Sequence, residues 1–210
     1  MKHLLIAAAI LLPAVSVFAQ KKNTIHEKQA GTFSLGTRNT ISLFNDDNAT
    51  GKGIGGQLRL RLSNRLNSEW YFDYITSKSG SYTYRNDYHI GWSILFYPGN
   101  FYSDHLLQPY LIAGHCFDYS KVAEQNNKAN SASRPSMATQ AGLGTHINIT
   151  PQLDCSLSGQ YMLHFGKDIE TTIDGGEVII EKKDFSGPDG HLLFTISFNY
   201  KFFHLWKAKS

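Results

Sequence analysis

Apolar and polar side chains alternate along most of the chain, beginning near Thr32 and continuing to Phe203. The alternation is clearest from His191 onward, where every second residue starting with Leu192 is a large apolar one and most residues between them are polar. A period of two places successive side chains on opposite faces of a β-strand. No segment of this region has a convincing helical period. The pattern therefore predicts an all-β fold.

Eight segments carry this alternation, and stretches rich in Gly, Asn, Asp, Ser and Lys separate them. The connections after the first, third, fifth and seventh segments are long and polar, whereas the others are shorter on average. An even number of strands with alternating long and short connections is typical of an antiparallel up-and-down barrel. The predicted strands cover residues 32–44, 54–62, 69–76, 87–97, 108–119, 137–149, 154–165 and 191–203.

The sizes of the side chains indicate which face of this barrel points outward. One face is crowded with aromatic and large aliphatic residues, and the other carries Gly, Ser and charged residues. An eight-stranded barrel is only just wide enough for its own side chains, so the small and polar face belongs inside and the bulky face belongs against lipid. A soluble lipocalin-like barrel with its apolar face inward is the alternative. The expected lipid-facing aromatics include Trp70, Phe72, Tyr88, Trp92, Phe194, Phe198 and Tyr200.

In strand number, alternation and loop lengths, the region from Thr32 to Phe203 resembles the small eight-stranded outer-membrane barrels of the OmpA/OmpX-like family. The resemblance implies an eight-stranded antiparallel up-and-down transmembrane β-barrel, monomeric in the outer membrane of a Gram-negative bacterium, in contact with lipid and lipopolysaccharide. Barrels of that family usually end on an aromatic residue. Here the alternation from Phe198 to Phe202 has that form, but residues 204–210 follow it.

The first 19 residues have the features of a cleavable secretory signal peptide. A short basic start precedes an apolar run from Leu4 to Val17, and the sequence from Val17 to Ala19 matches a small-x-small cleavage pattern. No later run reaches the roughly 18 apolar residues of a membrane helix. The sequence thus predicts a signal peptide at 1–19, a periplasmic segment at 20–31, the barrel at 32–203 and a periplasmic tail at 204–210.

The charge balance and the cysteine positions of the chain disfavour nucleic-acid binding and a disulfide. The chain has 210 residues with Lys+Arg 20 against Asp+Glu 17, a nearly neutral balance that does not favour nucleic acid as a partner. The only cysteines, Cys116 and Cys155, fall on predicted strands with another strand between them. Two strand spacings exceed the span of a disulfide, so both thiols are expected to be free.

Polar residues on the inward face are expected to form a network in the lumen. Buried charges persist only when they are paired, and a turn centred on Leu66 would place Arg59 opposite Asp73 as an ion pair. Such a network favours a closed, packed lumen over a narrow conduction path. Its expected members are Arg38, Arg59, Arg61, Glu69, Asp73, His89, Gln140, His146, Gln160, His164 and Lys201.

Three motifs invite a chemical interpretation, and each has a simpler one. His89, His146 and His164 could face inward together, but they lack metal-site spacing, so hydrogen-bonded lumen histidines are favoured and no metal is expected. Residues 51–56 match G-x-G-x-x-G, but they lead into a strand and not a helix, so no nucleotide cofactor is expected. The His-x-Ser pair of lipid A deacylases has no counterpart, so no enzymatic activity is expected.

The last long connection predicts a β-hairpin from Ile169 to Glu181, with Asp and Gly in its turn. An exposed strand edge can bind a partner by adding a strand, although the hairpin could instead merely extend its flanking strands. The candidate contact residues are Glu170, Thr172, Asp174, Gly175, Glu177, Ile179 and Glu181.

The sequence therefore predicts a non-enzymatic outer-membrane β-barrel. Its surface loops would serve adhesion, interaction or envelope integrity, with an extracellular or envelope protein as the partner. Two alternatives remain at this point: a narrow channel or carrier for small or apolar molecules, and a soluble periplasmic lipocalin-like binder.

Overall fold

The structure is a computed structural model that describes residues 29–44, 50–79, 82–99, 105–183 and 189–206. The predicted signal peptide, residues 1–19, lies outside the described residues, as do most of segment 20–31 and residues 207–210 of the tail. In the described ranges, no helix has the length and hydropathy needed to cross a bilayer.

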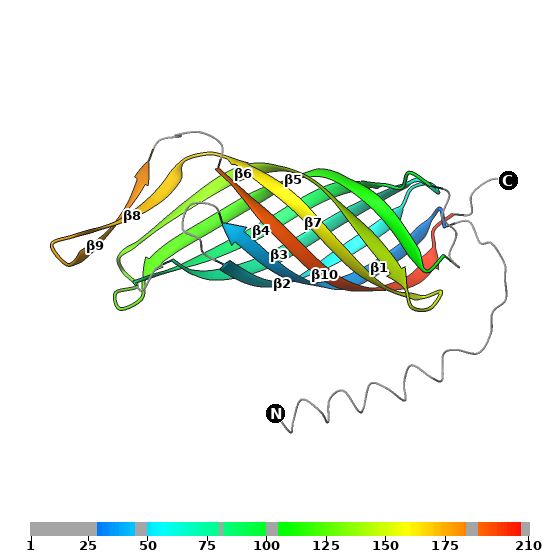
Figure 1. Cartoon of the computed structure of the whole chain (residues 1–210), viewed down its shortest axis with the longest axis horizontal. Coiled ribbons are helices and arrows are strands. Elements are labelled where there is room, and N and C mark those ends of the chain that lie inside the picture. The colour runs from blue at the N-terminus through cyan, green and yellow to red at the C-terminus, as the bar shows by residue number, and fades with distance from the viewer. Residues whose placement is uncertain (1–28, 45–49, 80–81, 100–104, 184–188, 207–210) are drawn as a thin grey trace, which may run out of the picture.

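Eight strands form a closed antiparallel barrel in the order β1-β10-β7-β6-β5-β4-β3-β2, and β8 and β9 form a separate two-stranded sheet (Figure 1). β1 pairs with β10 from Thr32 opposite His204 to Phe44 opposite His191, which closes the barrel. The predicted all-β, eight-stranded up-and-down barrel is therefore confirmed. The strands are β1 (Thr32–Phe44), β2 (Thr50–Arg61), β3 (Leu66–Ser79), β4 (Thr83–Phe96), β5 (Leu107–Glu124), β6 (Ser131–Asn148), β7 (Leu153–Phe165), β8 (Asp168–Asp174), β9 (Glu177–Lys183) and β10 (Asp189–His204).

The two ends of the barrel differ. At one end β2 is followed by β3, β4 by β5 and β6 by β7, and β1 begins and β10 ends there; this end is called the turn end. The opposite end, called the hairpin end, carries the β5–β6 connection and the projecting β8–β9 sheet (Figure 1). Residues before β1 also reach the turn end, where Gly31 N donates to the Arg61 carbonyl at 2.7 Å.

The β5–β6 hairpin is longer than the alternation predicted. Each strand has 18 residues, and their pairing continues to Ala123 opposite Ser131, so the long polar loop expected there is a short turn. The outward residues of the extension include Lys121, which pairs with Ser133. Because such positions are polar, the apolar–polar alternation stops before the strands do.

The outer face of the barrel is apolar and the inner face is largely polar. The seven predicted lipid-facing aromatics lie on the outer face, where Trp70 is 53% exposed and Phe198 is 49% exposed, with Trp92 partly covered by its neighbours. A soluble protein rarely exposes a continuous apolar surface of this extent, whereas a lipid-embedded barrel requires one. The polar interior contradicts the lipocalin-like alternative, in which the aromatics would line a ligand cavity.

Two apolar clusters also occupy the lumen. One lies toward the turn end around Tyr97 and Tyr110, and the other includes Tyr71, Ile75 and Met162. Free Cys116 belongs to the second cluster, and the partly buried Cys155 is also free. The interior is thus packed with both apolar and polar side chains, as expected for a barrel of eight strands.

The glycines of residues 51–56 lie in β2, which is followed by a turn and not by a helix, so they do not form a dinucleotide site. Gly55 faces the lumen between Arg38 of β1 and Asp73 of β3, its two register partners. Because Gly55 has no side chain, the side chains of Arg38 and Asp73 can meet across it.

Candidate functional site

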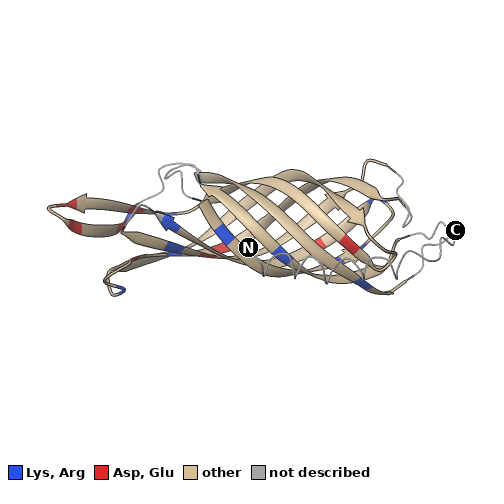
Figure 2. Cartoon of the chain, turned by 60° about the horizontal axis from the view of Figure 1, so that its bottom comes forward, with Lys and Arg blue, Asp and Glu red and all other residues tan. Residues whose placement is uncertain are grey.

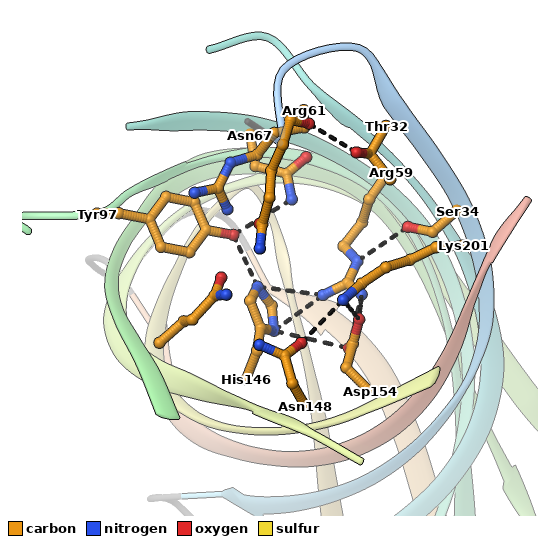
Figure 3. A pocket seen from close by; sticks show the side chains of 12 residues that line it. Thr32, Ser34, Arg59, Arg61, Asn67, Tyr97, His146, Asn148, Asp154 and Lys201 are labelled. Atoms are coloured by element: carbon orange, nitrogen blue, oxygen red, sulfur yellow. Dashed lines mark hydrogen bonds and ion pairs between the residues drawn. The ribbon is translucent and has the colours of Figure 1, made fainter. Parts of the chain in front are cut away.

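Asp154 is the centre of a polar cluster at the turn end of the lumen, here called the turn-end layer (Figure 3). Its two carboxylate oxygens accept hydrogen bonds of 2.7 and 2.8 Å from Arg59 Nη2. Lys201 Nζ lies 3.6 Å from the same carboxylate, and Asn199 Nδ2 donates to it at 3.1 Å. One carboxylate therefore pairs with two cations inside the barrel, and buried charges require such pairing because they are shielded from water.

Aromatic rings complete the turn-end layer. His146 Nε2 lies 2.7 Å from the Tyr97 hydroxyl, and the Arg61 guanidinium lies 3.5 Å from the centroid of the Tyr97 ring (Figure 3). Tyr110 packs on His146 with ring centroids 4.4 Å apart. The cavity among these side chains measures about 20 Å³, which is room for one or two water molecules and not for a solute.

A middle layer is centred on Arg38, halfway along β1. Arg38 Nε donates to Asp73 at 2.9 Å, and Arg38 Nη1 donates to Glu69 at 3.1 Å and to Gln57 at 2.9 Å. Its guanidinium also lies 4.2 Å from the centroid of the Tyr71 ring. Both acids in this layer thus pair with one arginine that comes from a different strand.

The predicted ion pair between Arg59 and Asp73 is wrong. The β2–β3 register places Arg59 opposite Glu69, four residues before the predicted partner, because the turn is centred near residue 64 and not at Leu66. Asp73 pairs with Arg38 instead, and Arg59 reaches across the lumen to Asp154.

The layers are connected by neutral side chains. Gln57 Nε2 donates to Asn199 Oδ1 at 2.6 Å, and Asn199 in turn donates to Asp154, so the middle layer joins the turn-end layer. On the other side of the lumen, the Tyr71 hydroxyl donates to Gln140, and Gln140 Nε2 donates to Ser93 Oγ at 2.6 Å. These contacts cross the barrel interior from one wall to the other.

A third cluster, the histidine layer, lies closer to the hairpin end. It consists of His89, His164 and His191, whose rings stack or tilt against one another with centroids 4.8 to 6.0 Å apart. Asp118 lies beside it, with its carboxylate oxygens 3.3 Å from His89 Nε2 and 3.3 Å from His164 Nδ1. His146 also faces the lumen, as the alternation indicated, but it belongs to the turn-end layer and not to this cluster.

Of the eleven predicted lumen residues, all except Lys201 are buried, and Lys201 is partly exposed near the opening at the turn end. Asp118, Asp154 and His191 were missed. Asp154 and His191 are the first residues of their predicted strands, and Asp118 lies near the end of its strand. All three have the inward parity of their strands, so extending the alternation to the strand ends would have found them.

Ser156, His146 and Asp154 resemble a catalytic triad by residue type. Ser156 Oγ lies 2.7 Å from His146 Nδ1, and the nearest Asp154 oxygen lies 3.9 Å from the same nitrogen. A triad needs the serine and the acid on opposite ring nitrogens, whereas here Tyr97 occupies the other nitrogen. The arrangement is a packed polar contact and does not activate a nucleophile.

The predicted outer hairpin is present as β8 and β9, with Asp174 opposite Glu177 across a turn of Gly175 and Gly176. Both glycines have positive φ, 58° and 92°, as a two-residue hairpin turn requires. The hairpin forms its own sheet, so it does not simply extend its flanking barrel strands. Acidic residues lie toward its free end (Figure 2).

The β5–β6 hairpin supports the β8–β9 hairpin. Asn130 Nδ2 donates to the Val178 carbonyl at 2.6 Å, and Arg134 pairs with Asp168 at 3.1 Å. The candidate contact residues lie on the β8–β9 sheet and its turn, where Glu170 and Ile179 are partly exposed and the others are exposed: Thr172, Asp174, Gly175, Glu177 and Glu181. The two hairpins together form the most prominent projection from the hairpin end (Figure 1).

No protein-family model matches the chain, and no curated protein sequence matches it. Solved structures of small outer-membrane barrels do match its fold. Neisserial surface protein A is 18% identical, with a TM-score of 0.55 over 82% of this chain and 98% of that one. A major outer membrane protein from Thermus thermophilus is 11% identical, with a TM-score of 0.57 over 81% and 98%. OprG from Pseudomonas aeruginosa is 16% identical, with a TM-score of 0.54 over 85% and 99%.

The closed barrel, its apolar outer face and these similarities define the fold class. The chain has the fold of the small outer-membrane β-barrels, as the resemblance to the OmpA/OmpX-like barrels predicted.

Proposed function

We propose that this chain is a non-enzymatic barrel of the bacterial outer membrane, that its lumen is closed, and that it acts through protein contacts made by the β8–β9 hairpin outside the cell. The observation that carries the proposal is the contrast between the two regions. Side chains cross the lumen in three layers, whereas an independent hairpin projects beyond the barrel, and neither outer edge of its two-stranded sheet is paired among the described residues.

The closed lumen argues against a channel. Arg38, Arg59 and the three clustered histidines all extend across the interior, and each is buried. A solute would have to separate ion pairs that are shielded from water, which costs several kcal/mol for each buried ion left unpaired. The lumen is therefore suited to stabilising the barrel and not to transport.

The outer edge of β8 is suited to strand addition. Asp174 and Glu177 flank the two-residue turn and form a hydrogen-bonded pair, so by alternation the N–H of Thr171 points away from β9. No strand among the described residues pairs with this edge of β8. Main-chain hydrogen bonds from a partner's extended segment would complete it.

The absence of a working nucleophile in the lumen supports a non-enzymatic role. Within the described residues, the serine, histidine and aspartate contact in the turn-end layer has the wrong geometry for acyl transfer, and its members are buried in the lumen. The predicted signal peptide and the lipid-suited outer face both support location in the outer membrane.

The purified barrel should be silent in a planar lipid bilayer. We expect no stepwise current beyond that of the protein-free bilayer, because the ion pairs of Arg38 and Arg59 cross the lumen. A folded sample is recognised by its different migration on a detergent gel before and after boiling. Discrete channel openings from such a sample would contradict the closed lumen and favour the channel alternative.

Thr171→Pro should abolish partner contact, because proline removes the N–H that points outward from the free edge of β8. A photo-crosslinking side chain at Ile173, which is 57% exposed, provides the measurement in intact cells. We expect a protein adduct in the parent chain, its loss in Thr171→Pro, and its retention in Thr171→Val, which keeps the N–H and the branched side chain. Replacing residues 168–183 by a short Gly-Ser turn should also remove the adduct and leave the barrel folded. An adduct of equal yield in Thr171→Pro would refute strand addition.

A further inference from the structure

Three histidines from distant parts of the chain converge in the histidine layer. His89 lies on β4, His164 on β7 and His191 on β10. In the order of the barrel strands, β4 and β10 lie on opposite walls, so the rings meet near the axis of the lumen. One ligand nitrogen from each ring lies within 4.8 Å of the others.

Most of the ring nitrogens in this layer have no hydrogen-bond partner, although all three side chains are only 1% exposed. Both nitrogens of His89, both nitrogens of His191 and Nε2 of His164 belong to this set. A buried polar atom without a partner is costly, and native structures contain few of them. Apart from Nε2 of His89, which lies 3.3 Å from Asp118, four such atoms remain in one small cluster and point to a ligand for these rings.

Asp118 provides the support that a metal-binding histidine usually has. Its carboxylate lies 3.3 Å from Nε2 of His89 and 3.3 Å from Nδ1 of His164. These contacts leave Nδ1 of His89 and Nε2 of His164 without a hydrogen bond. A carboxylate behind the ring fixes the orientation of the imidazole and raises its basicity as a metal ligand.

We propose that His89, His164 and His191 bind one Zn²⁺ ion inside the barrel, with Asp118 positioning two of the three rings. Imidazole nitrogens suit Zn²⁺ and neighbouring transition metals, whereas Ca²⁺ and Mg²⁺ require oxygen ligands. With Zn–N distances near 2.0–2.1 Å, three tetrahedral ligands lie about 3.3 Å apart, so the rings need only a small inward movement. The bound ion links β4, β7 and β10 across the lumen.

This site is independent of the hairpin function proposed above. Zinc binding connects three strands that are far apart in the sequence. Because the ion binds the folded barrel and not the unfolded chain, it stabilises the folded barrel. The site explains why three imidazoles share the interior of the barrel without direct hydrogen bonds to one another.

Metal binding is tested on the full mature barrel in detergent, stripped with a chelator and titrated with ZnCl₂, with Co²⁺ as a spectroscopic probe. We expect one Zn²⁺ per chain and a visible Co²⁺ spectrum of the tetrahedral type. His191→Gln should weaken Zn²⁺ binding by about 100-fold or more, because it removes a ligand. Asp118→Asn should weaken it by about 10-fold, which is the usual effect of losing a carboxylate that hydrogen-bonds to a metal-binding histidine. His115→Gln is the matched control, because that ring faces outward and should leave the affinity unchanged.

X-ray absorption of the zinc-loaded parent chain keeps the proposal testable if a histidine variant fails to fold. We expect three imidazole nitrogens in the first coordination shell, at about 2.0–2.1 Å. The proposal is overturned if the folded parent chain binds no stoichiometric zinc at micromolar concentration. It is also overturned if a folded His191→Gln variant binds zinc as tightly as the parent, or if the spectrum lacks imidazole ligands.

Discussion

Replacing Asp154 with asparagine is expected to lower the free energy of unfolding of the barrel by about 3–5 kcal/mol. Asp154 accepts two hydrogen bonds from Arg59 and lies 3.6 Å from Lys201, and the asparagine would leave both cations in the lumen without a counter-ion. Removing one partner of a buried ion pair is costly because the remaining charge stays desolvated. Denaturant titration in lipid vesicles, followed by tryptophan fluorescence, gives the measurement.

The control for this variant is Glu170→Gln, which removes an exposed ion pair with Lys183 on the β8–β9 hairpin. Exposed pairs contribute about 0–1 kcal/mol, so the control should unfold almost as the parent does. Adding Arg59→Met to Asp154→Asn should restore part of the lost stability, because it removes one of the two buried cations that have no counter-ion. If Asp154→Asn lowers the free energy of unfolding by less than about 1 kcal/mol, water must solvate the two cations. That result would contradict a packed turn-end layer.

Adding one methyl group to Gly55 is expected to cost about 2–3 kcal/mol, while the same change at the next residue should cost almost nothing. A Cβ at Gly55 would overlap the Phe72 carbonyl oxygen and the Asp73 carboxylate. To make room, β2 would have to move away from β3, and Arg38 would lose its close contact with Asp73. The Gly55→Ala variant should therefore have a lower unfolding midpoint and a smaller folded fraction on an unheated gel.

Gly56→Ala is the matched control for the packing of Gly55. Gly56 points outward, and the nearest atom to its added Cβ is the Gly36 carbonyl oxygen at 3.7 Å. Glycine in a strand is less favourable than alanine, so this variant should be neutral or stabilise the barrel by up to about 1 kcal/mol. Equal unfolding free energies for the two variants would show that Gly55 does not set the spacing of β2 and β3.

The alternation of residues was sufficient to predict most of the fold. Side chains such as Trp70 and Phe198 lie outside and Arg38 and Asp73 lie inside, because the period of two depends only on local backbone geometry. The β8–β9 hairpin was also predictable, since its Gly-Gly turn is a local signal. Strand ends were less predictable where the outward face has no large apolar residue, as in the extension of β5 and β6.

The partners within the lumen were not predictable in the same way. Arg59 was assigned to Asp73 because the turn centre was placed too far along the chain, and in a barrel this shift changes every pairing across the two strands. The alternation places His191 inside the barrel, but it does not show that His191 meets His89 and His164, which lie on two other strands.

The amino-acid pattern was enough to predict the eight-stranded barrel, the face of each strand that points toward lipid, and a hairpin that projects from one end. These features follow from strand periodicity and turn chemistry, which act over a few neighbouring residues. The folded structure was needed to show that Arg59 pairs with Asp154 and that three histidines meet near the axis of the lumen. Such contacts depend on register, strand tilt and closure of the barrel, which bring together residues that are far apart in the chain.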